Sequence, residues 1–308
     1  MTINLYSGSE TACLAKIISK YHGIELGKVT IVKYADGEFQ PAYIDNIRGT
    51  DVFIIQSTHP PSENLFELLM LIDAARRASA RSIVAVIPYL GYARQDCKEK
   101  SRVSIASKLV ANLLVSAGVN RIITLDLHSD QIQGFFDIPV DNLLASSIFI
   151  PYIQTLTLPD LIFASPDIGG AGRIESYAKH FQTDFVICYK NQIHPNVVEK
   201  ILLIGDVKGK NVVIIDDLVD TGETILMAAQ MIMQSGAFSV RAMVTHPLLS
   251  GNASESIEKS VLHELIVTDT IPLHQQISKI KVLSTADLFA EVLHRIKNNE
   301  SISTLFYY

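Results

Sequence analysis

Short apolar runs that alternate with helical patterns are the feature that most constrains how this chain can fold. The runs are apolar at consecutive positions, which is typical of strands covered on both faces. Strands are predicted at Val52–Ile55, Ile83–Ile87, Arg121–Leu125, Leu161–Ala164, Phe185–Ile187, Val212–Ile215, Val240–Val244 and Leu265–Val267. Helices are predicted between them at Glu63–Ala78, Ile105–Ala117 and Thr224–Gln234. This alternation predicts an α/β protein with mainly parallel sheets flanked by helices.

The length of 308 residues favours two domains. The pattern resets in a region bracketed by Pro139, Pro151 and Pro159, which predicts a junction near residues 140–150 and domains at 1–143 and 144–308, with the last residues returning to the first domain. Ile122–His128 and Val213–Val219 both run from a strand into acidic residues. This weak echo is consistent with a duplicated fold.

Composition narrows the class of protein. The net charge of -6 argues against a general nucleic-acid binder, which normally carries a basic face. The 3 cysteines form no C-x-x-C pair, which favours a reducing compartment. The amino terminus lacks the apolar core of a signal peptide, and no apolar run approaches a membrane span. We therefore expect a soluble, cytoplasmic protein with no nucleic-acid or membrane partner.

The segment VVIIDDLVDTGET at Val212–Thr224 carries the strongest chemical signal. A buried strand ends at two carboxylates, and a turn then leads into a helix. Ligands of open α/β sheets bind at the carboxyl ends of strands, and free N–H groups at a helix start suit a phosphate. The candidate binding residues are Asp216, Asp217, Asp220, Thr221, Gly222, Glu223 and Thr224. The carboxylates can accept hydrogen bonds from sugar hydroxyls, and Gly222 lets the backbone approach a phosphate.

A less specific interpretation is that these Asp and Thr side chains only cap a helix. Capping does not require adjacent carboxylates at a strand end. The pattern resembles the phosphoribosyl-binding loop of type I phosphoribosyltransferase folds, but that loop serves both the transferases and the enzymes that make their donor.

Further segments separate these two classes. They are Tyr34 with Asp36-Gly37-Glu38, YLGYARQD at Tyr89–Asp96, DLHSDQIQGFFDIPVDN from Asp126 to Asn142, and SPDIGGAGR at Ser165–Arg173. In this order and spacing, from about residue 3 to Phe306, the chain closely resembles class I ribose-phosphate diphosphokinase, also called PRPP synthetase. The resemblance implies two type I phosphoribosyltransferase-like domains that flank an active site.

The resemblance also assigns the ATP side. Tyr34, where the family usually has Phe, offers a ring for adenine stacking, although an ordinary strand aromatic would look the same in sequence. Asp36, Gly37 and Glu38, which could be a plain hairpin turn, would hold ATP and reach the site of a neighbouring subunit. Arg94 and Gln95 would bind ATP at the start of a segment, 94–108, with net charge +3, which could also be a solvated loop. Cys97 and Ser104 depart there from the usual Lys or Arg and Pro.

The metal and diphosphate contacts follow by resemblance as well. His128 and Asp167 would position Mg²⁺, which needs few protein ligands because it also binds substrate phosphates. Gly169, Gly170 and Gly172 fit a second anion cradle before a helix, for the diphosphate. Asp137 and Asp141 are expected to be structural.

One departure concerns catalysis. YKNQIHPNV at Tyr189–Val197 places Lys190 at the catalytic lysine of the family, with His128 as the second catalytic residue. Gln192 stands where the family has an arginine that also contacts ribose 5-phosphate, and His194 lies near it. Glutamine supplies hydrogen bonds but no charge for the transferring phosphoryl group.

The sequence thus predicts transfer of the β,γ-diphosphoryl group of Mg-ATP to the C1 hydroxyl of ribose 5-phosphate, with a hexamer built from dimers and with phosphate and ADP as effectors, these last by resemblance. Two alternatives stay open. One is a non-catalytic regulatory subunit, favoured by Gln192. The other is a phosphoribosyltransferase that acts on a base.

Overall fold

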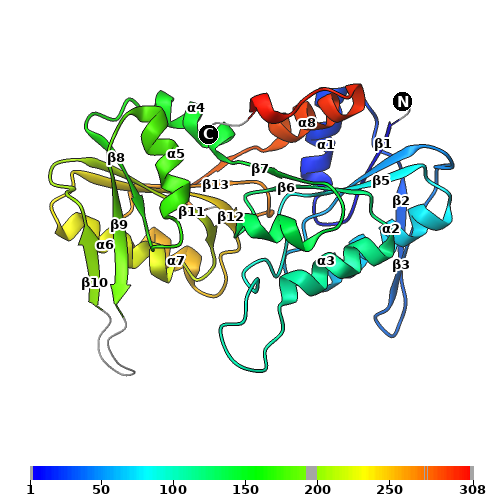
Figure 1. Cartoon of the computed structure of the whole chain (residues 1–308), viewed down its shortest axis with the longest axis horizontal. Helices are drawn as coiled ribbons and strands as arrows, with labels where there is room; N and C mark the ends of the chain where they lie inside the picture. The colour runs from blue at the N-terminus through cyan, green and yellow to red at the C-terminus, as the bar shows by residue number, and fades with distance from the viewer. Residues whose placement is uncertain (1–2, 192–199, 274, 276, 306–308) are drawn as a thin grey trace. The chain divides into compact units, whose positions relative to one another are not determined.

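A computed structural model describes residues 3–191, 200–273, 275 and 277–305 (Figure 1). The chain divides into two compact units. The first runs from the amino terminus to Leu144 and also takes Thr270–Pro272 and Ser284–Thr304. The second takes Ala145–Asp269 and Leu273–Leu283 together with Leu305. Each unit is built around its own sheet.

The first unit contains a parallel sheet with strand order β1-β4-β5-β6-β7. Its strands are β1 (Ile3–Ser7), β4 (Asp51–Ile55), β5 (Ser82–Ile87), β6 (Arg121–Leu125) and β7 (Val140–Leu143). β4 is buried along its whole length, as its unbroken apolar run predicts. A separate antiparallel hairpin is formed by β2 (Val29–Lys33) and β3 (Phe39–Tyr43).

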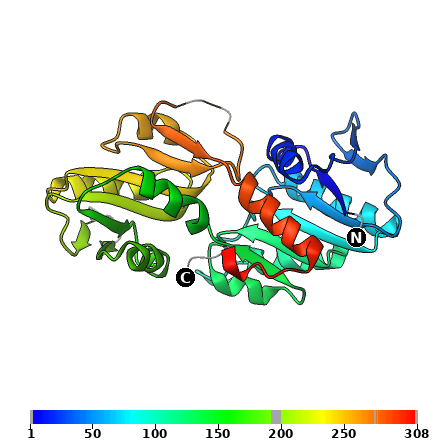
Figure 2. The same cartoon turned by 90° about the horizontal axis from the view of Figure 1, so that it is seen from above.

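Helices cover both faces of this sheet (Figures 1 and 2). α1 packs against α8 on one face, and α2 packs against α3 on the other. The helices of the first unit are α1 (Ala12–His22), α2 (Glu63–Arg77), α3 (Ala106–Ala117), α8 (Ala286–Asn298) and the 3₁₀ turns η1 (Asp130–Phe135) and η2 (Ser303–Leu305), whose last residue belongs to the second unit. The apolar faces of α2 and α3 and the strands form a core that includes Leu68, Leu71 and Ile54.

The second unit contains a sheet with strand order β10-β9-β8-β11-β12-β13-β14, parallel except at the β9–β10 hairpin. Its strands are β8 (Leu161–Ser165), β9 (Phe185–Asn191), β10 (Lys200–Ile204), β11 (Asn211–Val219), β12 (Ser239–Pro247), β13 (Leu265–Thr268) and β14 (Ile280–Leu283). Its helices are α4 (Ser146–Thr155), α5 (Ala171–Phe181), α6 (Glu223–Gln234) and α7 (Ala253–Glu258). Val212, Ile214, Ala228 and Ile232 lie in its core.

The predicted fold class is confirmed, and so is each predicted strand and helix to within a few residues at its ends. Of the prolines that bracket the expected junction, Pro151 lies inside α4. Strands β1, β2, β3, β7, β10 and β14 were missed; β2 and β14 are partly exposed and lack an unbroken apolar run.

The two units repeat one order of elements. Each has a strand and a helix, then a hairpin, and then parallel strands of which the first two are each followed by a helix. The pairing of Ile122–His128 with Val213–Val219 is wrong in detail. The first segment belongs to β6, the fourth strand of its sheet order, whereas the second belongs to β11, which lies between β8 and β12 as β4 lies between β1 and β5. Among the described residues, no helix is long and apolar enough to cross a membrane.

Candidate functional site

The carboxylates of β11 lie where this strand extends past one of its neighbours. Pairing of β11 with β8 ends at Ile214, whereas pairing with β12 continues to Val219. Asp216 and Asp217 are therefore inside the observed strand, beyond the predicted end at Ile215. One edge of β11 is uncovered by β8 at this level, so side chains there can reach a ligand.

The turn after β11 has the backbone that its glycine predicts. Gly222 has a φ of 78°, a left-handed conformation that other residues rarely adopt, and α6 begins at the next residue. The amide of Ser250 donates to the carbonyl of Asp220 at 3.0 Å, which anchors the turn. Thr221, Glu223 and Thr224 are exposed. The N-cap residue of α6 is Gly222, which has no side chain of its own to cap the first helical N–H groups.

Arg173, in the first turn of α5, contacts both carboxylates. Its Nη1 donates to Oδ1 of Asp217 at 3.1 Å and lies 3.6 Å from Oδ1 of Asp216. The backbone amide of Asp217 donates to Oδ1 of Asp216 at 2.9 Å. The sequence interpretation assigned no role to Arg173. A cation directly after a glycine loop is the signal that could have pointed to it.

The carboxylates of this cluster repel one another in a largely buried place. Burial and the adjacent carboxylate of Asp217 raise the pKa of Asp216 well above its usual range, and the guanidinium of Arg173 opposes that rise. Asp167 adds to the repulsion. Carboxylates so close together are typical of binding sites that use both to accept hydrogen bonds or to face a cation.

The β8–α5 loop brings the predicted metal contact to the same unit. Oδ1 of Asp167 accepts the amide of Gly170 at 3.0 Å, and its carbonyl accepts the hydroxyl of Ser165 at 2.6 Å. A Cβ at Gly170 would lie 2.4 Å from Oγ of Ser165, so a side chain there would displace this hydroxyl from its bond to the carbonyl of Asp167. Gly172 has open space around it and Gly169 is exposed. The loop thus forms an exposed turn before α5, as an anion cradle requires.

The predicted catalytic lysine lies on the hairpin of the second unit. Lys190 is in β9, and its backbone pairs with Ile201 of β10. Gln192 and His194 lie outside the described residues.

The predicted adenine contacts lie on the hairpin of the first unit. The amide of Tyr34 donates to the carbonyl of Glu38 at 2.8 Å, and Gly37 has a φ of 97°. Asp36 closes the turn by accepting the amide of Glu38 at 3.0 Å. The Tyr34 ring is 48% exposed, and its hydroxyl donates to Gln40. The expected hairpin turn is therefore present, and the ring of Tyr34 is accessible for stacking.

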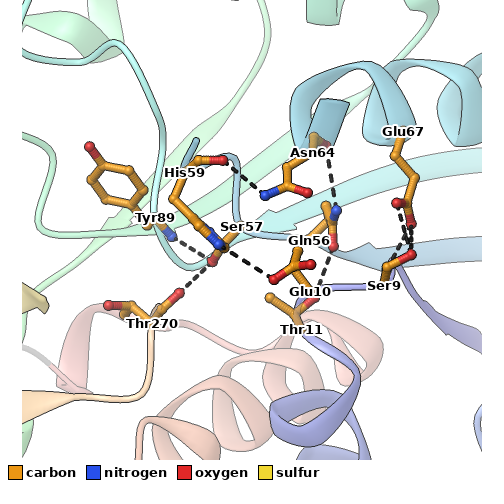
Figure 3. A network of polar contacts seen from close by, with 10 residues as sticks. All are labelled: Ser9, Glu10, Thr11, Gln56, Ser57, His59, Asn64, Glu67, Tyr89 and Thr270. Atoms are coloured by element: carbon orange, nitrogen blue, oxygen red, sulfur yellow. Dashed lines mark hydrogen bonds and ion pairs between the residues drawn. The ribbon is translucent and has the colours of Figure 1, made fainter. Parts of the chain in front are cut away.

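Arg94 and Gln95 lie on the segment between β5 and α3, and both are exposed. The start of this segment is fixed by buried polar residues that follow β4 (Figure 3). The amide of Gly91 donates to the Thr58 hydroxyl at 2.7 Å, and the amide of Tyr89 donates to Ser57 at 3.1 Å. The two predicted ATP contacts therefore follow a rigidly held turn.

His128 follows β6 and is exposed, next to the buried Asp126. Asp141 pairs with Arg121 at 2.7 Å, and burial raises the pKa of its carboxyl. No cluster of three or more His, Cys, Asp or Glu side chains with metal-site geometry occurs among the described residues. The exposed carboxylate of Asp167 and the exposed imidazole of His128 are each of a kind that can bind a Mg²⁺ ion whose other ligands are phosphates and water.

A surface pocket of the second unit lies at the opposite ends of its strands. Gln182, Thr183, Asp184 and Lys210 line it, near the amino-terminal ends of β9 and β11. It contains none of the predicted site residues. Ligands of parallel sheets bind at the carboxyl ends, so we assign this pocket no part in the site.

Repeated parallel units, each with a hairpin, and loops suited to phosphate and sugar at the strand ends of the second unit define a protein of the phosphoribosyltransferase-like class. Family models match at residues 3–118, as the N-terminal domain of ribose phosphate pyrophosphokinase, and at residues 179–307, as the phosphoribosyl synthetase-associated domain. The chain belongs to the ribose-phosphate pyrophosphokinase family of enzymes.

Full-length relatives support this assignment. The chain is 50% identical to the ribose-phosphate pyrophosphokinase of Porphyromonas gingivalis over 306 residues, which is 99% of this chain and 98% of that protein. It is also 50% identical to that of Campylobacter jejuni, over 98% of each chain. The crystal structure of phosphoribosylpyrophosphate synthetase from Mycobacterium smegmatis matches with a TM-score of 0.92 and 34% identity, over 97% of this chain and all of that one.

Proposed function

We propose that this chain transfers the β,γ-diphosphoryl group of ATP to the C1 hydroxyl of ribose 5-phosphate, giving phosphoribosyl diphosphate and AMP. The observation that carries the proposal is the pair of carboxylates, Asp216 and Asp217, at an uncovered edge of β11 directly before a phosphate-binding turn. Family membership supports the same reaction.

In this proposal the turn from Asp220 to Thr224 binds the 5-phosphate. N–H groups at the start of α6 and the exposed hydroxyls of Thr221 and Thr224 donate to its oxygens. Asp216 and Asp217 accept hydrogen bonds from the ribose hydroxyls, and Gln192 contributes a neutral contact. This arrangement fixes the C1 hydroxyl for attack.

ATP is bound by residues of the first unit. The Tyr34 ring stacks on adenine, and Asp36, Gly37 and Glu38 hold the nucleotide from the hairpin, which we propose serves a neighbouring subunit of a hexamer. Arg94 provides paired donors for phosphate oxygens, and Gln95 adds a polar contact.

The reaction is an in-line displacement at the β-phosphorus. The C1 oxygen forms a bond to this phosphorus and releases its proton, while the bond from the phosphorus to the oxygen of the α-phosphate breaks and AMP leaves. Lys190 offsets the negative charge that develops on the transferring group, so that positioning and electrostatics supply most of the acceleration.

His128 and Asp167 are the residues that would help hold Mg²⁺, which neutralises the phosphate oxygens of ATP when it is bound. Their side chains are exposed, and Asp167 is kept in place by the amide of Gly170. The role of the chain is to orient this carboxylate and this imidazole.

The test is AMP release from ATP by the purified chain with Mg²⁺ and phosphate, with and without ribose 5-phosphate. AMP that forms only with the sugar supports the proposal. Because Gln192 replaces a cation, we expect Gln192→Arg to raise kcat by roughly 10- to 100-fold, as charged contacts to a transferring group do. Absence of AMP from both the wild type and this variant, with ATP still bound, would refute the proposal.

Gln192 favours one second candidate, a regulatory subunit that binds nucleotide without turnover. Mixing the chain with an active family member separates the two functions. A regulatory subunit changes the rate of its partner, whereas an enzyme adds its own sugar-dependent AMP. Phosphate and ADP, the effectors proposed for this chain, should be included in both assays.

A further inference from the structure

Arg173 links two loops that end neighbouring strands of the second unit. It belongs to α5, directly after the turn that holds Asp167, and its guanidinium reaches the carboxylates of β11. Its side chain is 22% exposed, and those of Asp216 and Asp217 are 16% and 8% exposed. The three groups are thus largely withdrawn from water, where an ion pair is strong and a lost partner is costly.

The carboxylates cannot keep this arrangement by themselves. They are adjacent in sequence and partly buried, so their negative charges repel one another. Oδ1 of Asp216 is already fixed by the amide of Asp217, and Oδ1 of Asp217 is fixed by Arg173. One oxygen of each carboxylate is therefore oriented by the protein, and the contacts of Arg173 help to fix how both carboxylates are turned.

We propose that Arg173 is a positioning residue for ribose 5-phosphate, because it holds Asp216 and Asp217 in the orientation that accepts hydrogen bonds from the sugar hydroxyls. This inference rests on the proposed function of the carboxylates. The direction of the pKa shift agrees with it, since Arg173 counters the rise in the pKa of Asp216 and so favours the form that accepts hydrogen bonds.

A direct role of Arg173 on the phosphates of ATP would leave a different signature. A residue that contacts ATP alters KM for ATP, or kcat. A residue that acts through Asp216 and Asp217 alters KM for ribose 5-phosphate and leaves KM for ATP near its wild-type value.

The experiment compares the full-length wild type with Arg173→Gln, Arg173→Lys and the control Arg241→Gln. Arg241 forms an ion pair of similar burial with Glu264 at 2.9 Å in the same unit. It lies near the amino-terminal end of β12, whereas the candidate site is at the carboxyl ends of the strands. KM values for both substrates are measured by AMP release, and binding of ribose 5-phosphate is measured by calorimetry with Mg²⁺ and phosphate. Thermal unfolding confirms that each variant is folded.

We expect Arg173→Gln to raise KM and Kd for ribose 5-phosphate by roughly 10- to 100-fold, the size typical of a lost charge-assisted hydrogen bond. KM for ATP should stay within about twofold, since its contacts are unchanged. Arg173→Lys should recover part of the affinity because it restores the charge without the planar fork. Arg241→Gln should leave all three constants unchanged.

Two results would overturn the inference. The first is a folded Arg173→Gln with unchanged affinity for ribose 5-phosphate. The second is an equal rise of KM for both substrates. A wild type that binds ribose 5-phosphate but releases no AMP would refute the proposed function alone, and the ratio of the Kd values would still decide the role of Arg173. A wild type that binds no ribose 5-phosphate would refute both.

Discussion

Gly91→Ala is the substitution whose effect the structure defines most directly. A Cβ at this position would lie 2.1 Å from the carbonyl oxygen of Thr58. This oxygen belongs to buried backbone after β4, so no side-chain rotation can relieve the contact. Non-bonded atoms settle at about 3.5–4.0 Å, and the two segments would have to separate by roughly 1 Å or more.

The magnitude follows from two losses. Overpacking of a dense interior costs about 1–3 kcal/mol. The hydrogen bond from the Gly91 amide to the Thr58 hydroxyl, 2.7 Å long, would also be weakened, at a further cost of about 1 kcal/mol. A loss of about 2–4 kcal/mol lowers the melting temperature by roughly 5–15 °C in a domain of this size.

The same displacement should reach the ATP contacts. Only Tyr92 and Ala93 separate Gly91 from Arg94 in the sequence. A shift of about 1 Å at a substrate-positioning residue can cost on the order of 10²-fold in rate. We expect Gly91→Ala to raise KM for ATP while affinity for ribose 5-phosphate is retained. Both are measured by AMP release, alongside a thermal melt.

Gly134→Ala is the matched control. Gly134 is in the same unit, and a Cβ there meets nothing within 4 Å. Its melting temperature and KM for ATP should equal those of the wild type. If Gly91→Ala melted and bound ATP like this control, the steric argument and the proposed coupling to Arg94 would both be refuted.

Two further predictions concern titratable groups. Asp216→Asn removes a buried charge from a repelling pair, so the melting temperature should rise by a few degrees, since about 1 kcal/mol corresponds to 2–4 °C. KM for ribose 5-phosphate should rise at least about tenfold in the same variant. A melting temperature lower than that of the wild type would contradict the expected relief of repulsion. Burial raises the pKa of Glu67, so its stabilising contribution is fully present below its usual pKa and is lost as pH rises through the raised value. Urea unfolding from pH 4 to pH 8 should therefore show a smaller decline for Glu67→Gln than for the wild type, and identical pH profiles would exclude the assignment.

The sequence predicted the parts of this fold that have strong local signals. Buried parallel strands such as Val52–Ile55 are apolar throughout and were found at nearly their true bounds. The hairpin strands β2 and β3 and the edge strand β14 were missed, because strands exposed on one side have no continuous apolar run. Pairing and strand order depend on contacts far apart in sequence, which no local pattern encodes.

The candidate site divides in the same way. The loop at Asp216–Thr224 combines a strand end, two acids and a glycine within one short segment, so its sequence is informative by itself. Arg173 is distant from that loop in sequence, and only the meeting of α5 with β11 reveals its contact. The supporting residues Ser57 and Thr58 were also invisible, since buried hydroxyls have no distinctive spacing.

Duplication of the fold raises the question of why only the second unit carries the paired acids. β4 occupies in the first sheet the position that β11 occupies in the second. When β4 and β11 are aligned from their first residues, Gln56 and Ser57 stand where the second unit has Asp216 and Asp217, and α2 and α6 begin at the same distance from those positions.

In the first unit the side chains of Gln56 and Ser57 form hydrogen bonds inside the protein. Gln56 accepts from the Thr11 hydroxyl and donates to a backbone carbonyl of α2, and Ser57 donates to the carbonyl of Thr270 at 2.6 Å (Figure 3). Both are fully buried. Neutral groups can be buried at low cost once they are hydrogen-bonded, whereas carboxylates there would need a cation such as Arg173. The same topology thus yields a packed support for the Tyr89–Gln95 segment in one unit and an open ligand edge in the other, and the charge at two positions decides which.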